Sequence, residues 1–168
     1  VKLAFLKKDA DFIIDTSKLL TRELRQELEK IFLKHQEYCN MFVTVLSFGF
    51  KYGIPEDADL VFDVRFLPNP YYVEELRPLT GEDQSVRDYV MQGGTCAQFL
   101  DKLYDMMDFL LPNYINEGKN QLVVAVGCTG GKHRSVTVAR ALCAHLTARA
   151  EYGIKIEHRD IDKDNKRK

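Results

Sequence analysis

Residues 127–136, GCTGGKHRSV, bring a thiol, three basic side chains and a hydroxyl into one short segment. Five residues separate Cys128 from Arg134, and Ser135 follows directly. A thiolate at this spacing can attack a phosphorus atom while the guanidinium binds the phosphoryl oxygens. The same groups can equally hold a phosphate and leave it intact. The segment therefore raises two possibilities, phosphoryl chemistry and phosphate binding.

The elements around this segment favour an anion site. QLVVAVG at 121–127 reads as a buried strand, and the sequence predicts a helix from about 134 to 150. The first N–H groups of a helix have no partner inside it and point at whatever lies beyond its end. Gly130 and Gly131 allow the loop to form a concave nest of N–H groups. Basic residues at a helix N-terminus conflict with its dipole unless an anion binds there. The alternative is a tight turn whose basic side chains lie in solvent.

Two sequence motifs of phosphate-handling enzymes can be compared with this segment. GxxxxGK[ST], the nucleotide-binding P-loop, occurs nowhere in the chain. C-x5-R-[ST] matches the loop of cysteine-dependent phosphatases, with Cys128 as nucleophile and Arg134 binding the transition state; nearby cations and the helix dipole would favour the thiolate. Such an enzyme needs a general acid, and no pattern distinguishes among Asp57, Asp59 and Asp63.

Alternating strands and helices predict an α/β domain with a mostly parallel or mixed sheet, flanked by helices and containing a phosphate-binding strand–loop–helix. We expect strands at 11–17, 41–50, 59–67, 121–127 and 153–159. We expect helices at 18–32, 83–91, 96–115 and 134–150, with Pro112 ending or kinking the third. An apolar content of 45% is enough to build a core.

Composition limits the cellular location, the state of the cysteines and the kinds of partner that we expect. No apolar run is long enough to span a membrane and no signal peptide is evident, so we expect a cytoplasmic protein. The four cysteines show neither CxxC spacing nor histidine partners at zinc-ligand spacing, which predicts reduced thiols and no metal site. From Lys132 onward the chain carries ten Lys or Arg and five Asp or Glu, a net +5, and such a basic end attracts phosphates or nucleic acid. Val1 and the charged tail indicate part of a longer protein.

Three long blocks closely resemble the C-terminal domain of the RapZ/YvcJ family: 47–72, 76–86 and 124–136. DADFIIDTSKL at 9–19 is similar to the end of the P-loop NTPase domain that precedes it in that family. The resemblance implies a remnant of the NTPase domain at 1–38 and a ligand-sensing domain at 39–168. It also implies a cytoplasmic, nucleotide-binding regulator whose missing N-terminal domain binds ATP or GTP, with no cofactor in these residues.

The resemblance further implies that the domain binds a phosphorylated sugar, in particular an amino sugar, or another phosphate-bearing small molecule. Some members are RNase adapters that bind a small regulatory RNA and present it to a ribonuclease. We expect a homo-oligomer with no membrane partner and no catalysis by these residues, NTPase activity belonging to the intact family protein. Two rival hypotheses stay open: the cysteine phosphatase, and an RNA-binding module without a metabolite site.

Residues are carried over position by position. The phosphate site implied by the family comprises Cys128, Thr129, Gly130, Gly131, Lys132, His133, Arg134 and Ser135. A second wall would come from the RFLPNP loop and the residue after it, through Arg65, Asn69 and Tyr71. Tyr71 replaces the histidine of adapter members and cannot carry a positive charge, so ligand identity or affinity would change. Candidate RNA-binding residues are Lys163, Lys166, Arg167 and Lys168, although intervening aspartates weaken their attraction for phosphates.

Overall fold

A computed structural model of the chain describes residues 41–149 and 152–163, with isolated positions among 14–28. The chain divides into two compact units, 1–38 and 39–168. The expected strand at 11–17 and helix at 18–32 lie almost entirely outside the described residues. The helices and strands named below all belong to the second unit.

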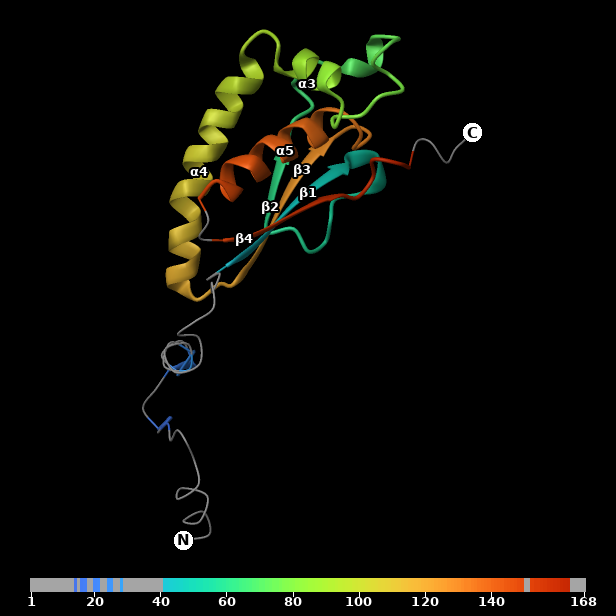
Figure 1. The fold of residues 1–168 in the computed structure, drawn as a ribbon. Coiled ribbons are helices and arrows are strands. Elements are labelled where there is room, and N and C mark those ends of the chain that lie inside the picture. Colours follow the sequence, from blue (N-terminus) through green and yellow to red (C-terminus); the bar gives the residue numbers. More distant parts are fainter. Residues whose placement is uncertain are drawn as a thin grey trace. The chain divides into compact units, whose positions relative to one another are not determined.

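The described part of this unit contains one parallel sheet of four strands (Figure 1). The strands are β1 (Phe42–Gly49), β2 (Leu60–Asp63), β3 (Gln121–Cys128) and β4 (Gly153–His158). Their order across the sheet is β2-β3-β1-β4. The α/β class expected from the sequence is confirmed, and all the strand pairs are parallel.

Three α-helices accompany the sheet: α3 (Gln84–Met91), α4 (Thr95–Glu117) and α5 (Arg134–Thr147). Two short 3-10 helices, η1 (Phe50–Tyr52) and η2 (Pro70–Tyr72), follow the ends of strands β1 and β2. Of the two effects expected of Pro112, ending the helix is wrong, because α4 continues past it. The exposed proline ring is accommodated within the helix, which continues until Gly118 adopts a left-handed φ of 95°. Within the described part of the chain, no helix is both long and apolar enough to cross a membrane.

Strand β2 ends earlier than the expected 59–67. The Val64 amide still donates to Gly127 of β3, but the carboxylate of Asp63 accepts the next amide, that of Arg65, at 2.9 Å. This local hydrogen bond turns the chain away from the sheet. The residues up to Asn69 therefore form a loop above the strand ends.

The core lies between the helices and one face of the sheet. Val43 and Val45 of β1 and their neighbours Leu122 and Val124 on β3 are buried on that face. Helix α5 packs on β1, β3 and β4, and α4 packs on α5. The buried positions of α4 follow helical spacing: Cys96, Leu100, Leu103, Met107 and Leu111. Met106 lies one residue off this stripe and is 46% exposed.

Topology places a crevice between β1 and β3. Right-handed crossovers put α3, α4 and α5 on one face, because β2→β3 and β3→β4 both advance in the same direction across the sheet. The β1→β2 connection, which includes η1, advances in the opposite direction. The chain therefore leaves the adjacent strands β1 and β3 toward opposite faces of the sheet. Open α/β sheets bind ligands in the crevice that this arrangement leaves at the carboxyl ends of the two strands.

Candidate functional site

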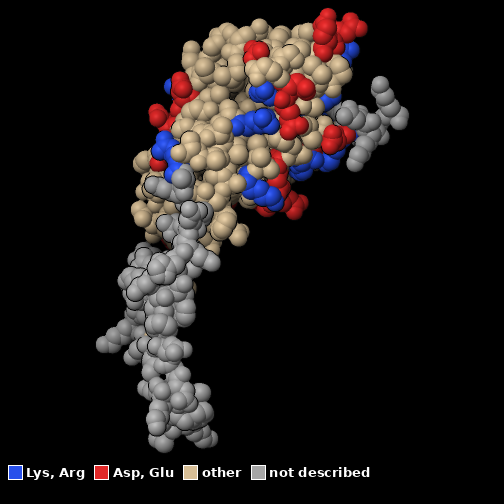
Figure 2. All heavy atoms as spheres, in the orientation of Figure 1, with Lys and Arg blue, Asp and Glu red and all other residues tan. Residues whose placement is uncertain are grey.

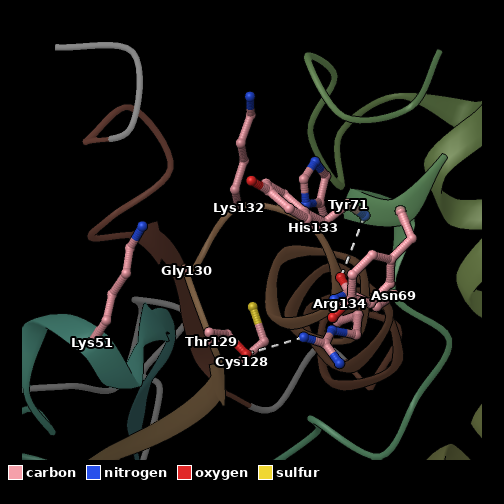
Figure 3. Close-up of a pocket in the computed structure, with 10 residues that line it drawn as sticks. Lys51, Asn69, Tyr71, Cys128, Thr129, Gly130, Lys132, His133 and Arg134 are labelled. Atoms are coloured by element: carbon pink, nitrogen blue, oxygen red, sulfur yellow. Dashed lines mark hydrogen bonds between the residues drawn. The ribbon is translucent and has the colours of Figure 1, made fainter. Parts of the chain in front are cut away.

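A pocket of about 330 Å³ opens at this crevice (Figure 3). In the close-up, Lys51 of η1 faces Asn69 and Arg134 across the loop that carries Cys128, Thr129 and Gly130. The pocket is lined by Lys51, Asn69, Tyr71, Tyr72, Cys128, Thr129, Gly130, Lys132, His133 and Arg134. Segments after β1, β2 and β3 thus meet at one place.

Close backbone approach shapes the floor. The Lys51 amide donates to Thr129 O at 3.2 Å, which ties η1 to the loop after β3. Gly131 has a φ of 75°, and a Cβ there would lie 2.6 Å from the Gly49 nitrogen. A Cβ on Gly49 would lie 2.6 Å from the Gly130 carbonyl carbon. Glycine is therefore required on both sides of the contact.

The Cys128 thiol lies at the inner end of the pocket. Its Sγ accepts a hydrogen bond from the Gly131 amide at 3.2 Å and lies 3.1 Å from Ser135 Oγ. Cys128 is 3% exposed, and Ser135 is fully buried and does not line the pocket. The serine hydroxyl expected at the anion thus contacts the thiol instead.

Arg134 joins the pocket to the loop after β2. Its Nη1 donates to the carbonyl oxygens of Arg65 at 2.6 Å and Leu67 at 3.3 Å. Its Nη2 donates to Thr129 Oγ1 at 3.2 Å. Nε is buried and has no hydrogen-bond partner, and the whole residue is only 5% exposed. The guanidinium therefore carries a buried charge and retains one unused donor.

Lys132 points toward the segment before α3. Its ammonium donates to Pro78 O at 2.7 Å, and its own carbonyl accepts the Gly81 amide at 2.9 Å. Gly81 is essential to this contact, because a Cβ there would lie 2.4 Å from the His133 oxygen. Lys132 contributes positive charge to the pocket from a fixed position, only 7% exposed.

His133 supplies a second unused polar atom. Its Nε2 is buried without a hydrogen-bond partner, and the residue is 8% exposed. Burial lowers the pKa of His133 below its usual value, and the neighbouring charge of Lys132 lowers this pKa further. The carbonyl groups of Leu79 and Arg77 act in the opposite direction. The imidazole is therefore neutral at pH 7, and because its other ring nitrogen donates to these carbonyl groups, Nε2 can accept one more hydrogen bond.

Two tyrosines form the outer wall. Asn69 caps η2, accepting the Tyr71 amide at 3.4 Å, and Arg77 Nε donates to Tyr71 O at 2.9 Å. The Arg77 guanidinium also lies over the Tyr71 ring, 5.0 Å from its centroid. Tyr71 is 54% exposed and Tyr72 80% exposed.

The structure gathers most of the residues singled out in the sequence around one pocket, while their roles in binding stay predictions. Arg65 differs from expectation: its side chain binds the exposed carboxylate of Asp63 through Nε and Nη2, at 2.6–3.0 Å, and does not line the pocket. Arg65 contributes its carbonyl oxygen to Arg134 instead. Gly131 shapes the loop from beneath.

Two lining residues, Lys51 and Tyr72, are not among the site residues predicted from the sequence. Lys51 follows a strand end, a position where α/β proteins place ligand contacts, but a solvated turn lysine has the same pattern. Tyr72 adjoins Tyr71, and an exposed tyrosine in a loop carries no distinctive signal. The close-up shows how Lys51 faces the arginine across the thiol-bearing loop (Figure 3).

None of the three aspartates considered as a general acid lines the pocket. Asp59 binds Lys119 at 2.6 Å and the Val123 amide at 2.8 Å, and Asp63 binds Arg65. Asp57 is exposed. Among the described residues, the lining contains no carboxylate at all. The site therefore combines several cationic side chains with the unused donor Nε of Arg134, a set that matches an anion of several oxygens.

Of the RNA-binding candidates, only Lys163 belongs to the described part of the chain. Its ammonium binds the fully buried Asp160 at 2.6 Å and lies over the Tyr52 ring. Asp160 in turn accepts the Gly49 amide at 2.8 Å. On the face shown in Figure 2, Lys and Arg side chains are interspersed with Asp and Glu. Lys166, Arg167 and Lys168 lie outside the described residues.

Comparison with known proteins adds an independent line of evidence. Residues 41–162 match the family model described as the RapZ C-terminal domain. A nucleotide-binding protein of Agathobacter rectalis is 64% identical over 163 residues, covering 97% of this chain and 56% of the relative. One from Lachnoclostridium phytofermentans is 60% identical over 162 residues, covering 96% and 56%. The chain thus spans little more than half the length of the curated relatives it matches.

Proposed function

Because the chain belongs to the RapZ C-terminal domain family, we propose that its pocket binds a phosphorylated sugar metabolite, an amino sugar included. The domain senses this ligand on behalf of a longer nucleotide-binding regulator. The phosphoryl group lies between the loop 128–134 and Lys51. Binding is reversible and forms no covalent bond.

One observation carries the proposal: the pocket concentrates positive charge and leaves buried polar atoms without partners. Buried polar groups are nearly always hydrogen-bonded, so each exception needs an explanation. His133 Nε2 and Arg134 Nε are two such exceptions, on consecutive residues that line the same pocket. Lys51 and Lys132 also line the pocket, and its described lining residues include no carboxylate. A bound phosphoryl group would complement this charge.

The same geometry argues against the rival phosphatase. A thiolate nucleophile needs an acid to protonate an alkoxide leaving group, and no carboxyl of the described residues lines the pocket. Arg134 donates to two carbonyl oxygens and so presents only part of its fork to a ligand. The contacts of Cys128 Sγ with Gly131 and Ser135 favour the rival, which is why it merits a direct test.

The wider role extends the proposal to the longer protein. There the domain serves as an RNase adapter that relates ligand binding to a small regulatory RNA and a ribonuclease, in the cytoplasm and in a homo-oligomer. The preceding domain supplies the binding of ATP or GTP. The name of the relatives, nucleotide-binding protein, is consistent with this arrangement. The RNA contact is assigned to the basic residues Lys163, Lys166, Arg167 and Lys168 near the end of the sequence.

Isothermal titration calorimetry of the 168-residue chain tests the binding proposal. We expect inorganic phosphate, glucose 6-phosphate and glucosamine 6-phosphate to bind competitively at one site, the sugar phosphates with a Kd below about 1 mM. Lys51→Gln should weaken all three, because it removes a pocket charge. Lys155→Gln, on the exposed side of β4, is the matched control. Absence of binding by every phosphate, or equal effects of the two variants, would refute the proposal.

A further inference from the structure

We infer that Tyr72 provides the surface on which the sugar ring of the proposed ligand rests, and that this residue sets the preference for a ring-bearing phosphate ester. The inference depends on the proposed function, since it assumes that the phosphoryl group occupies the cationic end. It adds a residue that determines specificity and the shape of the ligand beyond its phosphate.

An aromatic corner lies at the edge of the pocket. The rings of Tyr71 and Tyr72 have centroids 5.9 Å apart and an interplanar angle of 82°. Both residues line the pocket, and Tyr72 is the most exposed of the large apolar side chains described, at 80%. An aromatic ring left this exposed beside a polar pocket offers a flat apolar surface to a ligand.

The corner is held in place by its own contacts. Pro70 is buried at the start of η2, and Asn69 caps this short helix. Arg77 holds Tyr71 through its carbonyl and through its ring. A binding surface that is already ordered loses little conformational entropy when the ligand arrives. Tyr72 is therefore presented on a rigid support although its side chain is exposed.

The remaining walls indicate a sugar rather than a nucleobase. Apart from the two tyrosines, the described lining residues carry polar or charged groups, a thiol or no side chain. A stacked base gains most when apolar or aromatic surfaces cover both of its faces, and apart from the two tyrosines the only aromatic ring among the described lining residues is the buried imidazole of His133. A pyranose has one face of C–H groups for Tyr72 and a rim of hydroxyls for Asn69, Lys51 and Thr129. The pocket of about 330 Å³ lies at the small end of ligand sites, which suits a hexose phosphate.

Binding of four phosphate ligands of increasing complexity to the wild type and to two Tyr72 variants tests the inference. Inorganic phosphate lacks a body, glycerol 3-phosphate has a body without a ring, glucose 6-phosphate has the sugar ring, and adenosine 5′-monophosphate adds a base. We expect Tyr72→Ala to weaken glucose 6-phosphate binding about 3- to 10-fold and to leave the first two within about 2-fold, as expected for loss of one stacking contact. Tyr72→Phe keeps the ring and should stay within about 2-fold of the wild type.

The outcomes separate this inference from the proposed function. If no phosphate binds the wild-type chain, both fail. If the phosphates bind but Tyr72→Ala affects none of them, or weakens all by the same factor, the ring contact is refuted and the phosphate site survives. Tighter binding of adenosine 5′-monophosphate than of glucose 6-phosphate, lost in Tyr72→Ala, would refute the preference for a sugar. Circular dichroism checks that the variant of this exposed residue stays folded.

Discussion

The guanidinium of Arg134 donates a 2.6 Å hydrogen bond to the carbonyl oxygen of Arg65. This contact links the first residue of α5 to the loop after β2, and a second bond to Leu67 O reinforces it. One arginine thus holds together two walls of the pocket. The side chain lines the pocket with its positive charge, while Nη1 fixes the loop after β2 that forms one of the walls.

Replacing Arg134 should therefore damage both stability and binding. Arg134→Ala leaves two carbonyl oxygens without their charged donor, and we expect the free energy of unfolding to fall by about 3 kcal/mol or more. Arg134→Lys keeps the charge but loses the fork, so it should recover part of the stability and little of the phosphate affinity. Urea unfolding and phosphate titration measure the two effects. An Arg134→Ala variant as stable as the wild type would contradict the structural role.

A pair of glycines tests the close approach beneath the loop. Gly131 and Gly93 have almost the same positive φ, 75° and 76°, but of the two only Gly131 has atoms where a Cβ would lie. Gly93→Ala should cost about 1 kcal/mol of stability for its left-handed conformation. Gly131→Ala should cost about 2 kcal/mol more, because the new methyl overlaps Gly49. Equal unfolding midpoints for the two variants would show that the loop is not packed as described.

His133 should make the domain less stable in mild acid. Its folded-state pKa lies below the usual 6.5, mainly through burial. Below pH 6.5 the unfolded chain takes up a proton that the folded chain resists, so stability is full above that pH and is lost as pH falls through the folded pKa. His133→Gln should flatten the decline in urea midpoint between pH 7.5 and pH 5.5. His158, whose pKa is also lowered, accounts for part of the remaining decline. An unchanged pH profile in His133→Gln would contradict the assignment.

Cys128 distinguishes binding from catalysis. We expect the wild type to release no more p-nitrophenol from p-nitrophenyl phosphate than Cys128→Ser does, because Arg134 donates to two carbonyl oxygens and presents only part of its fork to a transferring phosphoryl group. Cys128→Ser should retain phosphate binding within about 3-fold, since serine preserves a polar group at the same place. Burial raises the pKa of Cys96 to about 11, so a second thiol is not expected to react in its stead. Turnover that disappears in Cys128→Ser would establish the phosphatase.

Much of the fold follows from local patterns in the sequence. β-Branched runs at 41–50 and 121–127 predicted the two central strands, and the spacing of apolar residues predicted α3, α4 and α5 to within a few residues. The helix was not expected to continue unchanged past Pro112, but a proline in a long helix can be tolerated where it is exposed, as it is here. The end of β2 was missed because a side chain, Asp63, competes for the next backbone amide.

The site was harder to derive than the fold. The loop 128–134 has a spacing that suggests an anion, but the partners of its side chains depend on tertiary contacts. No sequence pattern shows that Lys132 binds the Pro78 carbonyl or that Arg65 binds Asp63 instead of the pocket. Lys51 and Tyr72 reach the site because β1 and β2 end beside β3 in the sheet order, which the sequence alone did not reveal.

The most direct test of the account is an NMR titration of the ¹⁵N-labelled chain with glucose 6-phosphate. The account predicts saturable shifts of the backbone amides of Thr129, Gly130, His133 and Arg134, with competition by inorganic phosphate. Amides at the far end of the sheet, such as that of Gln121, should stay unchanged. Saturable shifts confined to other surfaces, or none at millimolar ligand, would contradict the claim that this loop holds a phosphoryl group.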